Sequence, residues 1–253
     1  MDIFWPEMIE PVALAGDEAH VFAVPVDQVL DSGRDWPAIL SADERERAER
    51  YKLHKPRRQF VAGRAGLRML LGQYLDVPAA AISFGSNAHG KPCLAASNTD
   101  ADLRFNVAHA EELVLVAMAV GCEVGVDVER MRTVNHLEQI AHRYFHAGEV
   151  QEILAKSAAE RAAAFLRCWT GKEAIVKAKG EGLNESLSNF RVPIDCHRGD
   201  WIEVAPETAG GSVTRSWLQS IEPCSDYVAA VALLGERRRL RCFAFPSKMS
   251  RPA

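Results

Sequence analysis

The spacing of apolar residues along the chain predicts an alternation of helices and strands. Between residues 57 and 75 the chain reads RRQFVAGRAGLRMLLGQYL, where apolar side chains recur at helical intervals. This period is typical of a helix that packs on a core by one face, and Pro56 is expected in its first turn. Residues 103–120 read LRFNVAHAEELVLVAMAV, in which two apolar, β-branched runs flank AHAEE as the strands of a hairpin do. The segment 123–129, EVGVDVE, predicts a further strand.

A similar order of elements returns in the second half of the chain. Apolar periodicity predicts helices across residues 135–179, and an extended stretch follows at 190–204. The segment 216–234, SWLQSIEPCSDYVAAVALL, then resembles the earlier hairpin in pattern. Residue identity between the two halves is slight, so the repeat is one of pattern alone.

This repeated pattern predicts an α+β fold of two similar lobes, each with helices packed on a small antiparallel sheet. We expect the lobes at residues 1–123 and 124–245, followed by a disordered tail at 246–253. A cleft between two lobes is a common place for a ligand to bind.

Length and composition favour a soluble globular protein. The chain has 253 residues, 48% of them hydrophobic, which is enough to bury a full core. No apolar run reaches the roughly 18 residues of a membrane span, and MDIFWPEMIE at the N-terminus carries acids where a signal peptide has Lys or Arg. We therefore expect a cytoplasmic protein that does not bind membranes. The cysteines include no CxxC pair, which argues against a zinc knuckle or a disulfide framework.

The charge distribution contains one basic stretch but gives no overall reason to expect nucleic acid as a partner. The net charge is −4, whereas residues 44–68 hold nine Lys or Arg against three Glu. A nucleic-acid-binding domain is one interpretation of this stretch. However, it has little aromatic interleaving to stack bases, and acids stand among the arginines. A solvated helix face explains most of these arginines, with a few left to meet phosphate.

Two acidic residues share one face of the predicted strand at 123–129. Side chains alternate along a strand, so Asp127 and Glu129 point to the same side, with Cα atoms roughly 6.6 Å apart. A half-exposed strand with a solvated acidic face is the simplest interpretation of this pair. The alternative is a hard divalent cation such as Mg²⁺, which binds a few carboxylates together with water and substrate phosphate. The Asp-x-Glu motif alone does not decide between them.

A second charged pair, Glu173 and Lys177, lies one turn apart on the last predicted helix. A Glu four residues before a Lys forms a favoured intrahelical ion pair, which contributes about 0.3–0.5 kcal/mol. Alternatively, Glu173 is a third carboxylate for the metal and Lys177 a cation for phosphate. Lys172, at the adjacent helical angle, is a further candidate to reach an anion. Gly180 and Gly182 are predicted to end the helix.

Four motifs resemble, in order and spacing, those of the Sfp-type 4′-phosphopantetheinyl transferases. They are HGKP at 89–92, FNVAH at 105–109, GVDVE at 125–129 and WTGKEAIVKAKGEGL at 169–183. The resemblance covers most of the chain, and the last motif is the most specific. One departure is Ala108, where the family usually has Ser before the histidine. The missing hydroxyl implies either that a backbone N–H or an arginine replaces it, or that affinity for coenzyme A is lower.

By this resemblance the two lobes are related by pseudo-twofold symmetry and bind coenzyme A between them. The implied enzyme transfers the 4′-phosphopantetheine arm of coenzyme A to a serine of an acyl or peptidyl carrier protein and releases adenosine 3′,5′-bisphosphate. It is expected to be Mg²⁺-dependent and monomeric, and to serve carrier proteins such as those of secondary metabolite biosynthesis. A non-catalytic module that binds coenzyme A or carrier proteins is the alternative, but it predicts a damaged set of acids, and all three carboxylates are present.

The resemblance also implies the roles of particular residues. The ligands of Mg²⁺ would be Asp127, Glu129 and Glu173. Lys177 would contact phosphate and assist departure of the leaving group, and Glu173 is the candidate general base, directly or through water. The phosphates of coenzyme A would be bound by His109, Lys91, Arg47 and Arg64.

Overall fold

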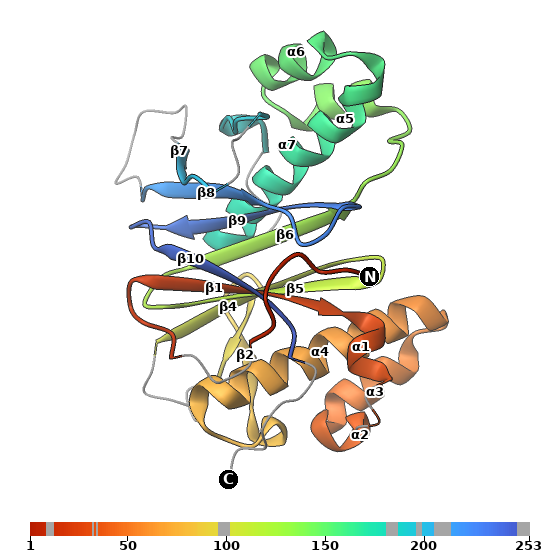
Figure 1. The fold of residues 1–253 in the computed structure, drawn as a ribbon, viewed down its shortest axis with the longest axis vertical. Coiled ribbons are helices and arrows are strands. Elements are labelled where there is room, and N and C mark those ends of the chain that lie inside the picture. The colour runs from red at the N-terminus through yellow and green to blue at the C-terminus, as the bar shows by residue number, and fades with distance from the viewer. Residues whose placement is uncertain are drawn as a thin grey trace. The chain divides into compact units, whose positions relative to one another are not determined.

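The computed structural model shows a chain that divides by backbone contacts into two units. It describes residues 1–8, 13–31, 33, 35–95, 102–180, 187–195, 199–204 and 214–246. The first unit comprises Met1–Ser86, Pro92–Gly121 and Arg239–Ala253, and the second comprises Asn87–Lys91 and Cys122–Arg238. Each unit contains a four-stranded sheet and one helix of 22 residues (Figure 1). The predicted α+β fold is confirmed.

The sheet of the first unit has the order β10-β1-β5-β4. The predicted hairpin at 103–120 is confirmed as the antiparallel strands β4 (Leu103–Ala110) and β5 (Leu113–Val120). The sequence analysis did not identify β1 (Glu18–Pro25) or β10 (Arg239–Ala244), which pair in parallel at the edge of this sheet, red beside blue in Figure 1. The expected antiparallel pairing holds for β1, β5 and β4, and the distant C-terminal segment β10 adds a parallel strand at the edge.

The helix predicted at 57–75 is confirmed as α4 (His54–Leu75), with Pro56 in its first turn. It packs on the sheet, and Leu67, Leu70 and Val114 belong to the core between them. The remaining elements of the unit are α1 (Val26–Leu30), α2 (Trp36–Ile39), α3 (Ala42–Arg50), the 3₁₀ turn η1 (Ala79–Ala81) and the short hairpin β2 (Phe84–Ser86) and β3 (Pro92–Leu94).

The sheet of the second unit is antiparallel throughout, in the order β6-β9-β8-β7. The strand predicted at 123–129 is β6 (Val124–Arg130), and the hairpin predicted at 216–234 is β8 (Ser216–Ile221) with β9 (Tyr227–Leu234). Both are confirmed. Within the stretch predicted as extended at 190–204, the described residues form only one short strand, β7 (Ile202–Val204).

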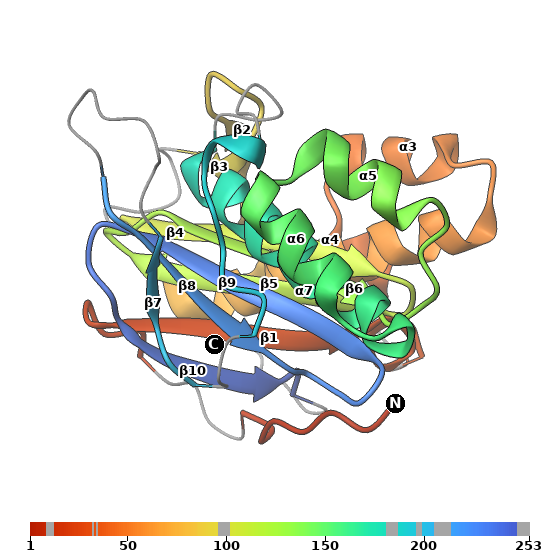
Figure 2. The ribbon, with the colours of Figure 1, turned by 90° about the horizontal axis from the view of Figure 1, so that it is seen from above.

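Helices cover the second sheet in two layers. The helices predicted across 135–179 are α5 (Leu137–Tyr144), α6 (Ala147–Ala155) and α7 (Ala158–Lys179), and the turn η3 (Leu187–Asn189) follows. Figure 2 shows α7 along the sheet, with α5 and α6 packed on α7. No helix among the described residues is long and apolar enough to cross a membrane.

The division by contacts differs from the predicted lobes at three places, one of which is the boundary, where Cys122 and Glu123 fall in the second unit. Strand β10 belongs to the first unit because it pairs with β1, although it was assigned to the lobe 124–245. The loop Asn87–Lys91 belongs to the second unit. The predicted symmetry between the lobes stays a prediction, and the predicted tail lies outside the described residues from position 247 onward.

A buried ion pair lies in the core of the second unit. The ammonium of Lys172 on α7 is 2.8 Å from the carboxylate of Glu149 on α6, and both side chains are fully buried. Lys172 also donates to the carbonyls of Leu187 and Phe190, at 2.6 Å each. Glu149 accepts the N–H of Val192 at 2.7 Å. Lys172 therefore points into the core. Its helical angle had suggested that it could reach an anion outside the protein, and this suggestion is wrong.

Replacement of Lys172 by Met should destabilise the protein strongly. Removal of one partner leaves the Glu149 carboxylate buried and uncompensated, which costs about 3–5 kcal/mol. Urea unfolding followed by circular dichroism measures this loss. The double variant Lys172→Met/Glu149→Gln should lose less than the single variant, because the buried charge is then absent. A single variant within about 1 kcal/mol of the wild type would contradict a structural role for the pair.

Candidate active site

The backbone of α7 lies directly on strand β6 at Gly125. A Cβ atom at this position would be 2.0 Å from the carbonyl oxygen of Ala174 and 2.4 Å from the amide nitrogen of Ala178. Only glycine permits this approach. Because side chains alternate along β6, the face that carries Gly125 also carries Asp127 and Glu129. The two acids therefore meet the helix that carries the second predicted pair.

Lys177 of α7 forms an ion pair with Asp127 of β6. The Nζ–Oδ1 distance is 2.6 Å, and the Asp127 side chain is 10% exposed. The interpretation of an acidic face open to solvent is therefore wrong for Asp127. The sequence had suggested that Lys177 pairs with Glu173 within the helix. The ion pair of Lys177 with Asp127 joins the helix to the strand.

The three carboxylates predicted as metal ligands lie close enough to repel one another. Burial raises the pKa of Glu173, and the negative charges of Asp127 and Glu129 raise it further, while Lys177 opposes them. Burial and the charge of Asp127 likewise raise the pKa of Glu129, against the effect of Arg132. These shifts identify a shared acidic cluster, made of Asp127, Glu129 and Glu173.

The acidic cluster suits a hard cation by its chemistry but is not assembled as a metal site. Among the described residues, no group of three His, Cys, Asp or Glu is placed to hold an ion. All three members supply carboxylate oxygens, the donors that Mg²⁺ prefers. The ammonium of Lys177 stands at Asp127, where it balances part of the negative charge. The residues present therefore supply the type of ligand atom that Mg²⁺ prefers.

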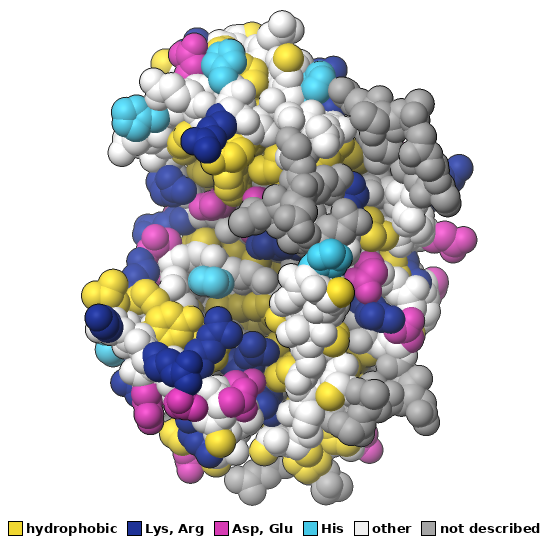
Figure 3. Space-filling model, turned by 180° about the vertical axis from the view of Figure 1, so that it is seen from behind, with side chains coloured by type: hydrophobic (Ala, Val, Ile, Leu, Met, Phe, Trp, Pro, Cys, Tyr) yellow, Lys and Arg dark blue, Asp and Glu magenta, His cyan; other side chains and the backbone are white. Residues whose placement is uncertain are grey.

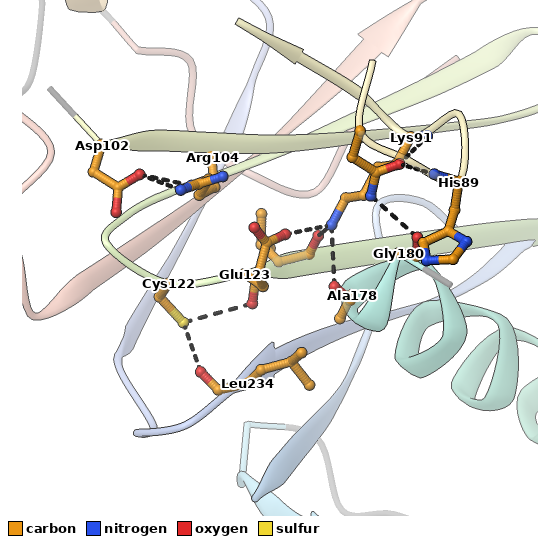
Figure 4. Close-up of polar contacts among 11 residues, drawn as sticks. His89, Lys91, Asp102, Arg104, Cys122, Glu123, Ala178, Gly180 and Leu234 are labelled. Atoms are coloured by element: carbon orange, nitrogen blue, oxygen red, sulfur yellow. Dashed lines mark hydrogen bonds and ion pairs between the residues drawn. The ribbon is translucent and has the colours of Figure 1, made fainter. Parts of the chain in front are cut away.

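Lys91 lies in the same unit, in the loop before β3. Its ammonium donates to the carboxylate of Glu123 at 2.7 Å and to the carbonyls of Val124 and Ala178 (Figure 4). The sequence analysis expected Lys91 to contact phosphates of coenzyme A. In the structure its donors are directed at groups of the protein.

Three basic residues of the first unit, Arg47, Arg64 and Arg68, line a cavity of about 270 Å³ between α3, α4 and β2. The guanidinium of Arg47 lies 5.0 Å from the centre of the Phe60 ring, and that of Arg64 lies 4.7 Å from the centre of the Phe84 ring. At these distances each guanidinium is attracted to the face of its ring. Figure 3 shows one face on which Lys and Arg side chains lie beside hydrophobic and acidic ones.

Glu44 organises the wall of this cavity. Its carboxylate is 2.7 Å from Nε of Arg68 and 3.3 Å from Nε of Arg64. Arg68 is 2% exposed and also donates to the carbonyl of Ile82 at 2.7 Å, so its donors serve the fold. Arg64 is more open, and burial lowers the pKa of its guanidinium while Glu44 opposes that shift. The sequence analysis missed Glu44 because a buried partner leaves no local signal.

The other predicted residue of the first unit is His109. It is exposed on β4 and stands opposite Val114 of β5, whereas the neighbouring Ala108 is 2% exposed. His109 is not among the residues that line the cavity. The structure thus groups Arg47 with Arg64 in the first unit, and Asp127, Glu129, Glu173 and Lys177 in the second.

Comparisons with known proteins cover both of these groups. Residues 123–232 match the 4′-phosphopantetheinyl transferase superfamily, and residues 33–121 match the N-terminal part of 4′-phosphopantetheinyl transferases. The 4′-phosphopantetheinyl transferase HetI of a Nostoc species is 33% identical over 225 residues, which is 88% of this chain and 91% of that protein. The chain belongs to the 4′-phosphopantetheinyl transferase family.

More distant relatives of this transferase are similar over a smaller part of the chain. The transferase Sfp of Bacillus subtilis is 25% identical over 68% of this chain and 75% of its own. The solved structure of Thermotoga maritima holo-[acyl-carrier-protein] synthase matches with a TM-score of 0.30 and 20% identity, over 46% of this chain and 64% of that one. The superfamily match spans the whole acidic cluster and Lys177.

The acidic cluster should destabilise the metal-free transferase. The folded protein raises the pKa of Glu173 above the ordinary value of 4.5, so it favours the protonated carboxyl, and stability is lost as the pH rises through the raised pKa. Glu173→Gln should therefore raise the melting temperature in EDTA at pH 7.5, with a gain that shrinks toward pH 4.5. Glu138→Gln, at an exposed position on α5, is the control and should change nothing. A lower melting temperature for Glu173→Gln at pH 7.5 would contradict this account.

Proposed function

We propose that this transferase moves the 4′-phosphopantetheine arm of coenzyme A to a serine hydroxyl of an acyl or peptidyl carrier protein. The observation that carries the proposal is the acidic cluster with Lys177, held on β6 and α7 where two family motifs meet. Relatives named as phosphopantetheinyl transferases along nearly the whole chain support it. The length of two units supports the further proposal that a cytoplasmic monomer suffices.

Asp127, Glu129 and Glu173 are the residues that would hold Mg²⁺. When bound, this ion would neutralise charge on the diphosphate of coenzyme A. Lys177 is the mobile cation of the site, because its ammonium pairs with Asp127 through a single carboxylate oxygen and its side chain is 29% exposed. By moving from Asp127 to the phosphate, Lys177 would free a ligand oxygen and stabilise the leaving group.

The proposed reaction is a single phosphoryl transfer. The serine oxygen of the carrier protein attacks the phosphorus that bears the pantetheine arm, and a new P–O bond forms. The bond from this phosphorus to the bridging oxygen breaks, and adenosine 3′,5′-bisphosphate leaves with the electron pair. Glu173 accepts the serine proton, directly or through a water molecule.

The cavity of the first unit would bind a phosphate of coenzyme A. Arg47 and Arg64 direct guanidinium groups at it, and charge-assisted hydrogen bonds to phosphate are strong. Glu44, which also lines the cavity, pairs with Arg64. His109 is the other candidate of this unit for a phosphate contact, by its place in the family motif.

The direct test incubates the protein with coenzyme A, Mg²⁺ and a panel of apo carrier proteins, followed by intact mass spectrometry of each carrier. The mass of phosphopantetheine should appear on a serine, and EDTA should abolish it. Asp127→Asn and Glu173→Gln should each lower kcat by on the order of 100-fold, since each removes charge stabilisation at the reacting diphosphate. Glu138→Gln is the control. Near wild-type rates for both variants at saturating Mg²⁺ would refute the site, and coenzyme A binding without any transfer would favour a non-catalytic module.

The cavity has its own test. Arg64→Met should raise KM for coenzyme A by about tenfold, the loss expected for one charged hydrogen bond, with a smaller effect on kcat. Arg50→Met is the matched control, because this arginine ends the neighbouring helix α3, is 70% exposed and pairs only on the surface with Glu46. Equal KM values for the two variants would exclude the cavity from coenzyme A binding.

A further inference from the structure

Lys91 joins the two elements that carry the acidic cluster. Its ammonium lies 2.7 Å from the carboxylate of Glu123, 3.2 Å from the carbonyl oxygen of Val124 and 3.1 Å from that of Ala178 (Figure 4). A lysine ammonium has three N–H donors, and three acceptors surround this one. The side chain is only 12% exposed.

The acceptors stand at the ends of β6 and α7. Val124 begins β6, three residues before Asp127, and Ala178 lies in the last turn of α7, next to Lys177. The last carbonyls of a helix have no partner within it, and a cation there is favoured by the helix dipole. Lys91 therefore satisfies a free helix carbonyl and ties it to the start of the neighbouring strand.

The loop that carries Lys91 is braced in this position. The side-chain oxygen of Asn87 accepts the N–H groups of His89 and Lys91 at 2.9 Å each, and its Nδ2 donates to the carbonyl of Gly180 at 3.1 Å. Gly180 has a φ of 68°, and a Cβ there would lie 2.9 Å from Cδ of Lys91. The end of α7 and the loop thus fit closely around the lysine.

We propose that Lys91 is a positioning residue, which holds the start of β6 against the end of α7 so that Asp127 and Glu129 face Glu173 and Lys177. This role replaces the phosphate contact that the family resemblance implied. The proposal rests on the proposed function for its kinetic readout but not for its binding readout.

The first experiment separates positioning from phosphate binding. Isothermal titration with coenzyme A should give the same Kd, within about twofold, for Lys91→Met and the wild type. In the transfer assay, Lys91→Met should lower kcat at least about tenfold with KM for coenzyme A unchanged, because small misplacements of reacting groups cost up to about 100-fold. A Kd and KM that rise about tenfold while kcat is kept would overturn the proposal and restore the phosphate contact.

Glu123→Gln provides a second test that leaves the lysine in place. If Lys91 positions the strand and helix, this variant should lower kcat modestly and leave the Kd for coenzyme A unchanged. If Lys91 binds phosphate, removal of the competing carboxylate should instead tighten coenzyme A binding. Lys156→Met is the matched control, because Lys156 is a lysine of the same unit that pairs with Asp195 on the surface, and neither quantity should change.

Hydrogen exchange makes the test independent of catalysis, and it also reports whether the variant is folded. Lys91→Met should speed amide exchange at the start of β6 and in the last turn of α7, with α5 and α6 unchanged. Unchanged exchange at both ends would overturn the proposal even if activity falls. If the wild type transfers nothing to any carrier, the proposed function fails, while the titration and the exchange still decide the role of Lys91.

Discussion

The contact between the α7 backbone and Gly125 of β6 is the constraint on which the site depends. A residue with a Cβ atom would collide with the helix backbone at this point. Without the contact, Asp127 and Glu129 would form an ordinary polar strand face, and Glu173 and Lys177 an ordinary surface pair. The approach of helix and strand converts these two local patterns into one acidic cluster, in which the charge of Asp127 raises the pKa values of both Glu129 and Glu173.

Two lysines of α7 differ in burial and in the acidic residue with which each forms an ion pair. Lys172 is fully buried with Glu149 and binds carbonyls of the chain beyond the helix, so it serves folding. Lys177, one turn later, is partly exposed and pairs with Asp127, so it can exchange one anion for another. A buried pair is costly to break, whereas a partly solvated pair is open to competition from a ligand. Lys172 is thus fully buried with its partner, whereas Lys177 is 29% exposed and remains within reach of solvent.

The arginines of the first unit also differ in burial and in their partners. Arg68 donates its N–H groups to Glu44 and to backbone carbonyls, and it supports the wall of the cavity. Arg64 shares Glu44 but keeps part of its guanidinium toward the cavity, over the ring of Phe84. Three members of the basic stretch, Arg47, Arg64 and Arg68, therefore line the cavity, and Arg68 among them is held by groups of the protein.

Local residue patterns were enough to predict α4, the hairpin 103–120, the hairpin 216–234, and the face shared by Asp127 and Glu129. Helical and strand periods of 3.6 and 2 can be recognised from neighbouring residues. The parallel pairing of β10 with β1, the inward direction of Lys172 and the contacts of Lys91 with the ends of β6 and α7 became visible only in the folded chain. In each case the partner lies far along the chain, and a side chain of given type and spacing meets it or not according to packing that no local pattern records.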